Sequence, residues 1–266
     1  MQIQRIEIQD LDKSIVGAKI WMSPDAPKGS GILKVPPYQW VFAAIRWAWL
    51  QWKARPDFEP IAAELSLAVQ STLTPQAIDE ANSRSTRDLF DWFVCCCAVL
   101  SGDSATLRRA ADATVFATSK AGPRHHYYQA LAGIIRARVE GDPEREREQL
   151  AIAEKFKPTG PHVFPSRALL RAFVDRDYAG LQKEAIKGAK KHWTDRYMGK
   201  KSLPVLIKDE PDHIILNTGN KDVYSPWPYV EAVFAKLAIL DGAKITYDEF
   251  WFPLKLVSTW REPSGK

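Results

Sequence analysis

Long hydrophobic runs are missing from this chain of 266 residues. The longest uninterrupted apolar stretch, Trp92 to Leu100, has nine residues, whereas a membrane-spanning helix needs about 18 or more. The first residues, Met1 to Glu7, lack the basic start and apolar centre of a secretory signal peptide. Together these features favour a cytoplasmic protein that does not bind a membrane.

Cysteine and histidine are scarce and badly spaced for metal binding. The only cysteines are Cys95, Cys96 and Cys97; neighbours in a helix cannot form an ordinary disulfide, which fits a reducing compartment. The five histidines include no pair four residues apart, and the adjacent His125 and His126 would point about 100° apart on a helix. We expect no metal or cofactor, with the cysteines buried in a helix and the two histidines at a helix start.

Catalytic motifs are also missing. There is no G-x-S-x-G elbow for a nucleophile, and Lys28–Gly31 lacks the spacing of a phosphate-binding loop. No arginine stands five to seven residues before a histidine, as in small helical ribonucleases of the HEPN type. Asp209, Glu210 and Asp212 lie in a proline-containing stretch without metal-ligand spacing and are interpreted as a solvated loop. We therefore expect a protein that is not an enzyme and has no catalytic residues.

Helical periodicity is abundant. Apolar residues recur at intervals of three and four along most of the chain, which predicts amphipathic helices. The stretch Leu89–Leu100 is apolar on all sides except at Asp91, as expected of a central helix. About ten helices are predicted, over residues 36–55, 57–70, 75–82, 89–100, 103–116, 124–140, 144–156, 169–173, 178–193 and 230–240.

Three acidic breaks separate successive helices. They are Ser101-Gly102-Asp103, Gly141-Asp142-Pro143 and Asp175-Arg176-Asp177, and the first aspartate-to-aspartate spacings, Asp103 to Asp142 and Asp142 to Asp177, are 39 and 35 residues. Glycine suits a helix end and aspartate caps the next helix. A period of this size predicts a mainly α, repeat-like array of helical hairpins.

The domain organisation follows from where this periodicity holds. Residues 1–35 are predicted to be an irregular lead-in, in which Ile6 and Ile8 allow a short strand or an extended segment. Residues 36–266 are predicted to be a single all-α domain. Within that domain, prolines at 204, 211, 226 and 228 interrupt the pattern around 196–228, where 213–216 could form a strand.

Basic residues gather in one place. Lys183 to Lys208 contains eight basic and two acidic residues, a net charge of +6 in a chain whose total is +5. In the predicted helix 178–193 the lysines share one face and the apolar residues the other. Three interpretations remain open: an ordinary solvated face, a site for an acidic protein, and a nucleic-acid site, although the aromatic residues fall on the apolar side.

Four tryptophans occupy the first helix. Trp47 and Trp49 point in nearly opposite directions, so one of them is either an exposed interface anchor or buried by a second layer of helices.

Part of the chain resembles a family of bacterial polymorphic-toxin immunity proteins, immunity protein 49. The resemblance covers about 127–257 and rests on hydrophobic spacing in three stretches, which are Tyr127–Leu131 leading to Glu140-Gly141-Asp142, then Leu169–Tyr178, then Tyr229–Gly242 with Ile245, Asp248 and Trp251–Leu254. The basic, proline-broken segment 196–228 departs from the family pattern.

The resemblance implies an all-α, cytoplasmic protein without enzymatic activity that binds and occludes a cognate toxin domain. Because the chain is basic, we expect either that the toxin has an acidic contact surface or that the protein binds away from a phosphate-binding groove of the toxin. The predicted partner-binding residues come from the basic helix and the segment after it: Lys187, Lys191, Arg196, Tyr197, Lys200, Tyr224 and Trp227. Two other classes fit the same features, a helical-repeat adaptor for host proteins and an RNA-binding helical protein.

Overall fold

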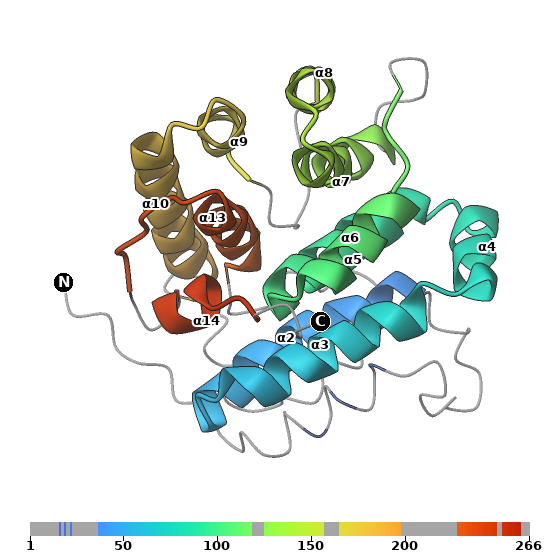
Figure 1. The fold of residues 1–266 in the computed structure, drawn as a ribbon, viewed down its shortest axis with the longest axis horizontal. Helices are drawn as coiled ribbons and strands as arrows, with labels where there is room; N and C mark the ends of the chain where they lie inside the picture. Colours follow the sequence, from blue (N-terminus) through green and yellow to red (C-terminus); the bar gives the residue numbers. More distant parts are fainter. Residues whose placement is uncertain are drawn as a thin grey trace.

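The computed structural model describes Val16, Lys19, Met22 and residues 37–118, 125–156, 165–197, 228–248 and 252–261. These residues form an all-α fold of packed helices (Figure 1). The predicted fold class is therefore confirmed. The predicted strands near Ile6 and at 213–216 lie outside the described residues. In the described part of the chain, no helix is long and apolar enough to cross a membrane.

The first layer is a pair of helices covered by a buried third one. α2 (Pro37–Ala54) and α3 (Phe58–Thr72) pack on each other, and both pack on α5 (Arg87–Ser101). The short α4 (Pro75–Ser83) joins α3 to α5. Every residue from Phe90 to Ser101 is buried, which confirms the prediction that this stretch forms a central helix.

The remaining helices extend the array pair by pair. α6 (Ser104–Ala113) packs on α5 and α7, α7 (His125–Glu140) pairs with α8 (Pro143–Glu154), and α9 (Arg167–Val174) pairs with α10 (Tyr178–Tyr197). α13 (Tyr229–Leu240) then returns to lie between α10 and α5, and the short α14 (Leu254–Ser258) packs on it (Figure 1). Because α13 contacts both, the later hairpins close back onto the central helix.

All three predicted aspartate caps are present. The Asp103 side chain accepts hydrogen bonds from the Ala105 and Thr106 amides, Asp142 from Arg145, and Asp177 from Gly180. Gly102 and Gly141 precede the first two with φ of +65° and +72°. At the third break Arg176 takes this left-handed conformation, with φ +58°, at some cost in backbone strain.

Two helix ends differ from the prediction. α6 ends at Ala113, so Phe116 lies beyond the helix, where the Arg136 and Arg145 guanidinium groups cover its ring at 4.4 and 5.0 Å. α10 continues to Tyr197, two residues into the segment predicted to be irregular. The first helix-breaking residue after Trp193 is Gly199, so nothing in the sequence stops the helix earlier.

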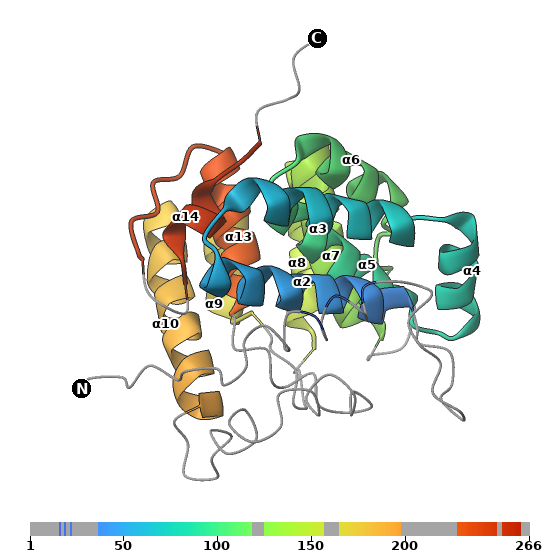
Figure 2. The ribbon, with the colours of Figure 1, turned by 90° about the horizontal axis from the view of Figure 1, so that it is seen from below.

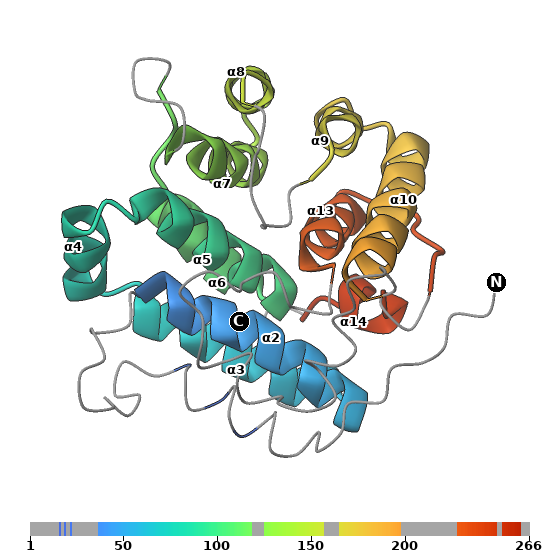
Figure 3. The ribbon, with the colours of Figure 1, turned by 180° about the vertical axis from the view of Figure 1, so that it is seen from behind.

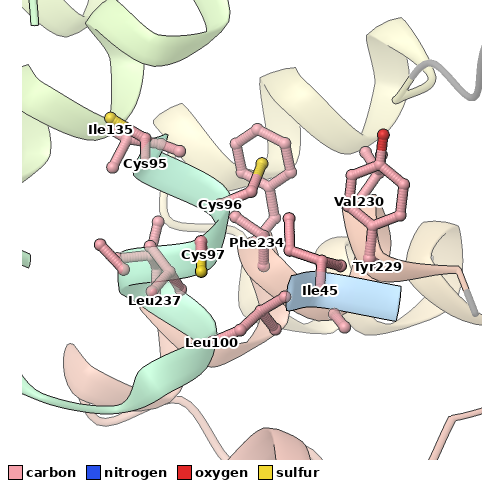
Figure 4. Packing of buried hydrophobic residues seen from close by; sticks show 14 of the residues in the cluster. Ile45, Cys95, Cys96, Cys97, Leu100, Ile135, Tyr229, Val230, Phe234 and Leu237 are labelled. Atoms are coloured by element: carbon pink, nitrogen blue, oxygen red, sulfur yellow. The ribbon is translucent and has the colours of Figure 1, made fainter. Parts of the chain in front are cut away.

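The core is continuous across the hairpins. The three cysteines are fully buried on α5, and Figure 4 shows Cys95 directed toward Ile135 of α7 and Cys96 toward Phe234 of α13. The cysteines thus fill the space between helices that are far apart in the sequence, as small apolar residues do. Burial raises the pKa of all three thiols, which keeps them protonated.

Candidate protein-binding surface

α10 has one buried and one charged face. Leu181, Ala185 and Ala189 are at most 3% exposed and pack toward α9 and α13. Four lysines are exposed on the opposite side: Lys183, Lys187, Lys190 and Lys191. We refer to these four residues as the lysine face. The helical spacing of the sequence places these lysines on the side opposite the apolar residues. The small alanines on the apolar side let α10 pack closely on its neighbours.

The lysine face lies at the margin of the fold. In three views α10 forms an outer edge of the helix array, with α9 and α13 on its inner side (Figures 1, 2 and 3). A partner could therefore approach the lysine face without displacing any described helix.

The electrostatics of this surface are those of solvated charges. Lys187 is 72% exposed at its side chain and its Nζ lies 3.5 Å from a carboxylate oxygen of Glu184. An exposed pair of this length contributes less than about 1 kcal/mol to stability. The lysines can consequently exchange such contacts for a stronger anionic partner at little cost to the fold.

The structure describes the positions of only some of the seven predicted partner-binding residues. Lys187 and Lys191 are exposed and share the lysine face. Arg196 and Tyr197 occupy the last turn of α10, where the backbone is described but not their side chains. Lys200, Tyr224 and Trp227 lie outside the described residues. The structure thus brings two of the seven together.

The tryptophans of α2 are not surface anchors. Trp40, Trp47, Trp49 and Trp52 are between 1% and 8% exposed. Of the two interpretations drawn from the sequence, burial by a second layer is correct, because α3 and α5 cover α2 and the Lys19 ammonium lies 5.6 Å from the Trp47 ring centre.

A buried cluster around Arg138 of α7 was not predicted. Its guanidinium binds Glu146 of α8 (Nε to Oε1, 2.8 Å) and Asp241 at the end of α13, and donates to the Phe173 carbonyl of α9 at 2.7 Å. It also lies over the Phe173 ring at 3.9 Å. These carboxylates raise the arginine's pKa despite its burial. The cluster joins four helices, and Arg138 and Glu146 within it are buried while Asp241 is exposed. Its role is therefore to hold the array together.

A second unpredicted group is Lys236 of α13, which is fully buried. Its Nζ donates to the Leu256 carbonyl at 3.1 Å and to the Thr259 carbonyl. Burial lowers the pKa of Lys236 to about 7. Two charged residues, Glu231 and Lys236, within an otherwise apolar helix are the sequence signal that could have found it.

The described residues contain no cluster of histidine, cysteine and carboxylate side chains that could hold a metal ion. His126, in the first turn of α7, is buried, and α7 begins at His125, as predicted. The candidate binding surface among the described residues is therefore the lysine face of α10. No family of known proteins, no curated protein and no solved structure matches the chain.

Proposed function

We propose that the protein is an immunity protein that binds a cognate bacterial toxin domain and neutralises it by occlusion, without turnover. The observation that carries the proposal is the lysine face, which lies on a 20-residue helix at the edge of the fold. The hydrophobic spacing over about 127–257, which resembles that of the immunity protein 49 family, motivates the same proposal.

Occlusion needs a tight and preformed interface. Protection requires nanomolar affinity or better, about −12 kcal/mol, which an interface of about 1,600 Å² with a few strong contacts supplies. α10 is 20 residues long and would span about 30 Å. A helix of this length presents its lysines in fixed relative positions, so little conformational entropy is lost from the backbone on binding.

The sign of the charge selects the partner's surface. Exposed lysines attract carboxylates, speed encounter and disfavour a basic surface. We therefore propose that the toxin domain presents an acidic surface to α10. The aromatic residue described on this helix, Tyr178, packs against the core, whereas binding of single-stranded nucleic acid relies on exposed stacking residues.

The test is charge reversal on the lysine face. Changing Lys187, Lys191 and Arg196 together to Glu should weaken toxin binding at least 100-fold, about 2.7 kcal/mol, measured by calorimetry at moderate salt. The matched control changes three exposed basic residues elsewhere, Arg108, Arg109 and Lys155, to Glu. The net charge changes equally, so long-range attraction is matched and only local contacts differ.

Equal loss of affinity in both triple variants would reduce the lysine face to a contributor of net charge. Unchanged affinity in the α10 variant would remove this face from the interface. Binding to RNA that falls steeply with salt, lost in the α10 variant, would replace the immunity function by nucleic-acid binding.

A further inference from the structure

The last described residues form a strap across the fold. Residues 252–261, which we call the strap, include α14 and run from α13 to the turn between α5 and α6. At its far end the Arg261 amide donates to the Gly102 carbonyl at 2.7 Å, and the Arg261 side chain lies 3.2 Å from Glu59 at the start of α3. The strap therefore links the last described helices to the first layer.

Lys236 is the buried polar contact beneath the strap. Its Nζ reaches the carbonyl groups of Leu256 and Thr259, which are strap residues, and lies 4.8 Å from the Phe58 ring centre and 5.3 Å from that of Trp260. In return, Trp260 Nε1 donates to the Lys236 carbonyl at 3.2 Å. A neutral amine has two N–H donors for these two carbonyl acceptors, whereas an ammonium has a third.

The charged groups around this contact face elsewhere. Glu59 of α3 and Asp103 of the α5–α6 turn lie 3.2 and 3.8 Å from Arg261, and Asp103 also caps α6. Lys255 of α14 is exposed. The buried part of α5 beside Gly102 carries no charge, and its one polar side chain there, Ser101, donates to the Ala98 carbonyl. Among the described residues no carboxylate contacts the Lys236 amine, so burial is uncompensated by an opposite charge.

We propose that the strap is a proton-dependent latch, which closes over a neutral Lys236 and opens when this side chain takes up a proton and reaches water. This device goes beyond the proposed function and is independent of it. The only covalent bond made on opening is the N–H bond of the ammonium, whose proton comes from solvent, while the hydrogen bonds between Lys236 and the strap are broken.

The pH window follows from proton linkage. Burial lowers the pKa of Lys236 to about 7 in the closed state, and exposure in the open state would return it toward its ordinary value of 10.5. Between these two values opening binds a proton, so the opening equilibrium falls about tenfold for each unit of rising pH. Below pH 7 both states carry the charge and the equilibrium becomes constant.

Hydrogen exchange on the intact chain tests the latch. The probes are the Val257 and Arg261 amides, which donate to the Pro253 and Gly102 carbonyls. Their protection factors, corrected for the intrinsic pH dependence of exchange and referenced to amides of α7, should rise up to about 100-fold from pH 7 to pH 9. A flat profile over this interval in the wild-type chain would overturn the proposal.

Three variants make the test specific. Lys236→Met keeps the apolar stem and cannot titrate, so its profile should be flat; a retained slope would assign the effect to another group and refute the latch. Lys255→Met, in α14 but exposed, should keep the wild-type slope. If Lys236→Met does not fold, Trp260→Phe removes a strap contact and leaves Lys236 in place. It should lower protection at every pH with the slope unchanged, and loss of the slope would contradict the proposal.

Discussion

The α7–α8 pair and α13 both bury polar side chains, but they satisfy them differently. In the α7–α8 pair, Arg138 meets two carboxylates, and the Gln149 amide exchanges two hydrogen bonds with the Ala117 backbone at 3.0 and 3.1 Å. In α13, Lys236 meets neutral carbonyls. Glu146 Oε2 of α8 and Glu231 Oε2 of α13 both lack a hydrogen-bond partner among the described residues. The difference is that Glu146 Oε2 has the Arg176 guanidinium 3.5 Å away, whereas Glu231 has no ion pair among the described residues.

As a result, Arg138 carries a permanent charge, whereas Glu231 and Lys236 of α13 can gain or lose theirs. The partners of Arg138 raise its pKa, so it stays charged at every pH the protein meets. On α13, burial moves both groups toward their neutral forms, raising the pKa of Glu231 to about 8 and lowering that of Lys236 to about 7. We therefore expect mutations in the α7–α8 pair to lower the stability of the fold at any pH. The contribution of α13 to stability should instead change with pH.

The largest expected effect comes from removing the cation of the charge-paired cluster around Arg138. Arg138→Ala leaves Glu146, which is 1% exposed at its side chain, without its buried counter-charge. Breaking such a pair costs about 3 to 5 kcal/mol, which urea unfolding would measure. Arg171→Ala is the matched control, because the Arg171–Glu154 pair is exposed and its loss should cost less than about 1 kcal/mol. Similar losses in the two variants would refute the role given to the Arg138 cluster.

The next effect is a pH dependence that belongs to Glu231. A carboxyl with a folded-state pKa of about 8 against 4.5 when unfolded stabilises the folded protein fully below pH 4.5. That contribution is lost as pH rises toward 8. Glu231→Gln cannot ionise, so its stability relative to wild type should increase by roughly 2 kcal/mol between pH 6 and pH 8.

Urea unfolding of both proteins at several pH values would measure this difference, in which all other titrating groups cancel. A difference that is constant from pH 5 to pH 8 would show that Glu231 is ionised in the folded protein. The statement that burial keeps the titratable groups of α13 neutral would then be wrong for Glu231.

The smallest expected effect concerns Gly133, which leaves space for the hydrogen-bonded side-chain amide of Gln149. A Cβ at Gly133 of α7 would overlap Gln149 Oε1, so Gly133→Ala should displace the amide from Ala117. The lost hydrogen bonds cost about 2 kcal/mol, of which the better helix propensity of alanine returns about 1 kcal/mol. Thermal or urea unfolding should therefore show a net loss of about 1 kcal/mol.

A double-mutant cycle isolates this contact. In a Gln149→Ala background the overlap is absent, so Gly133→Ala should be neutral or slightly stabilising there. The same loss in both backgrounds would mean that Gly133 does not serve Gln149.

The sequence predicted those features that depend on neighbours along the chain. The predictions of the aspartate caps and of a central helix over Leu89–Leu100, buried from Phe90 on, were correct because capping and apolar spacing are local properties. The prediction that the lysines of α10 share one face was correct for the same reason. The rest depends on distant partners: Arg138 and Asp241 are 103 residues apart, and whether Trp47 is buried depends on α3 and α5 rather than on its own helix.

We propose that this chain binds one toxin domain through the lysine face. The most direct measurement is capture with tagged protein from the producing cells at moderate salt, followed by mass spectrometry, with the Lys187, Lys191 and Arg196→Glu variant captured in parallel. We predict one stoichiometric partner, the C-terminal domain of a large secreted protein, that is retained by the wild type and lost from the variant. Recovery of RNA, or of several housekeeping proteins at low occupancy with both baits, would contradict the account.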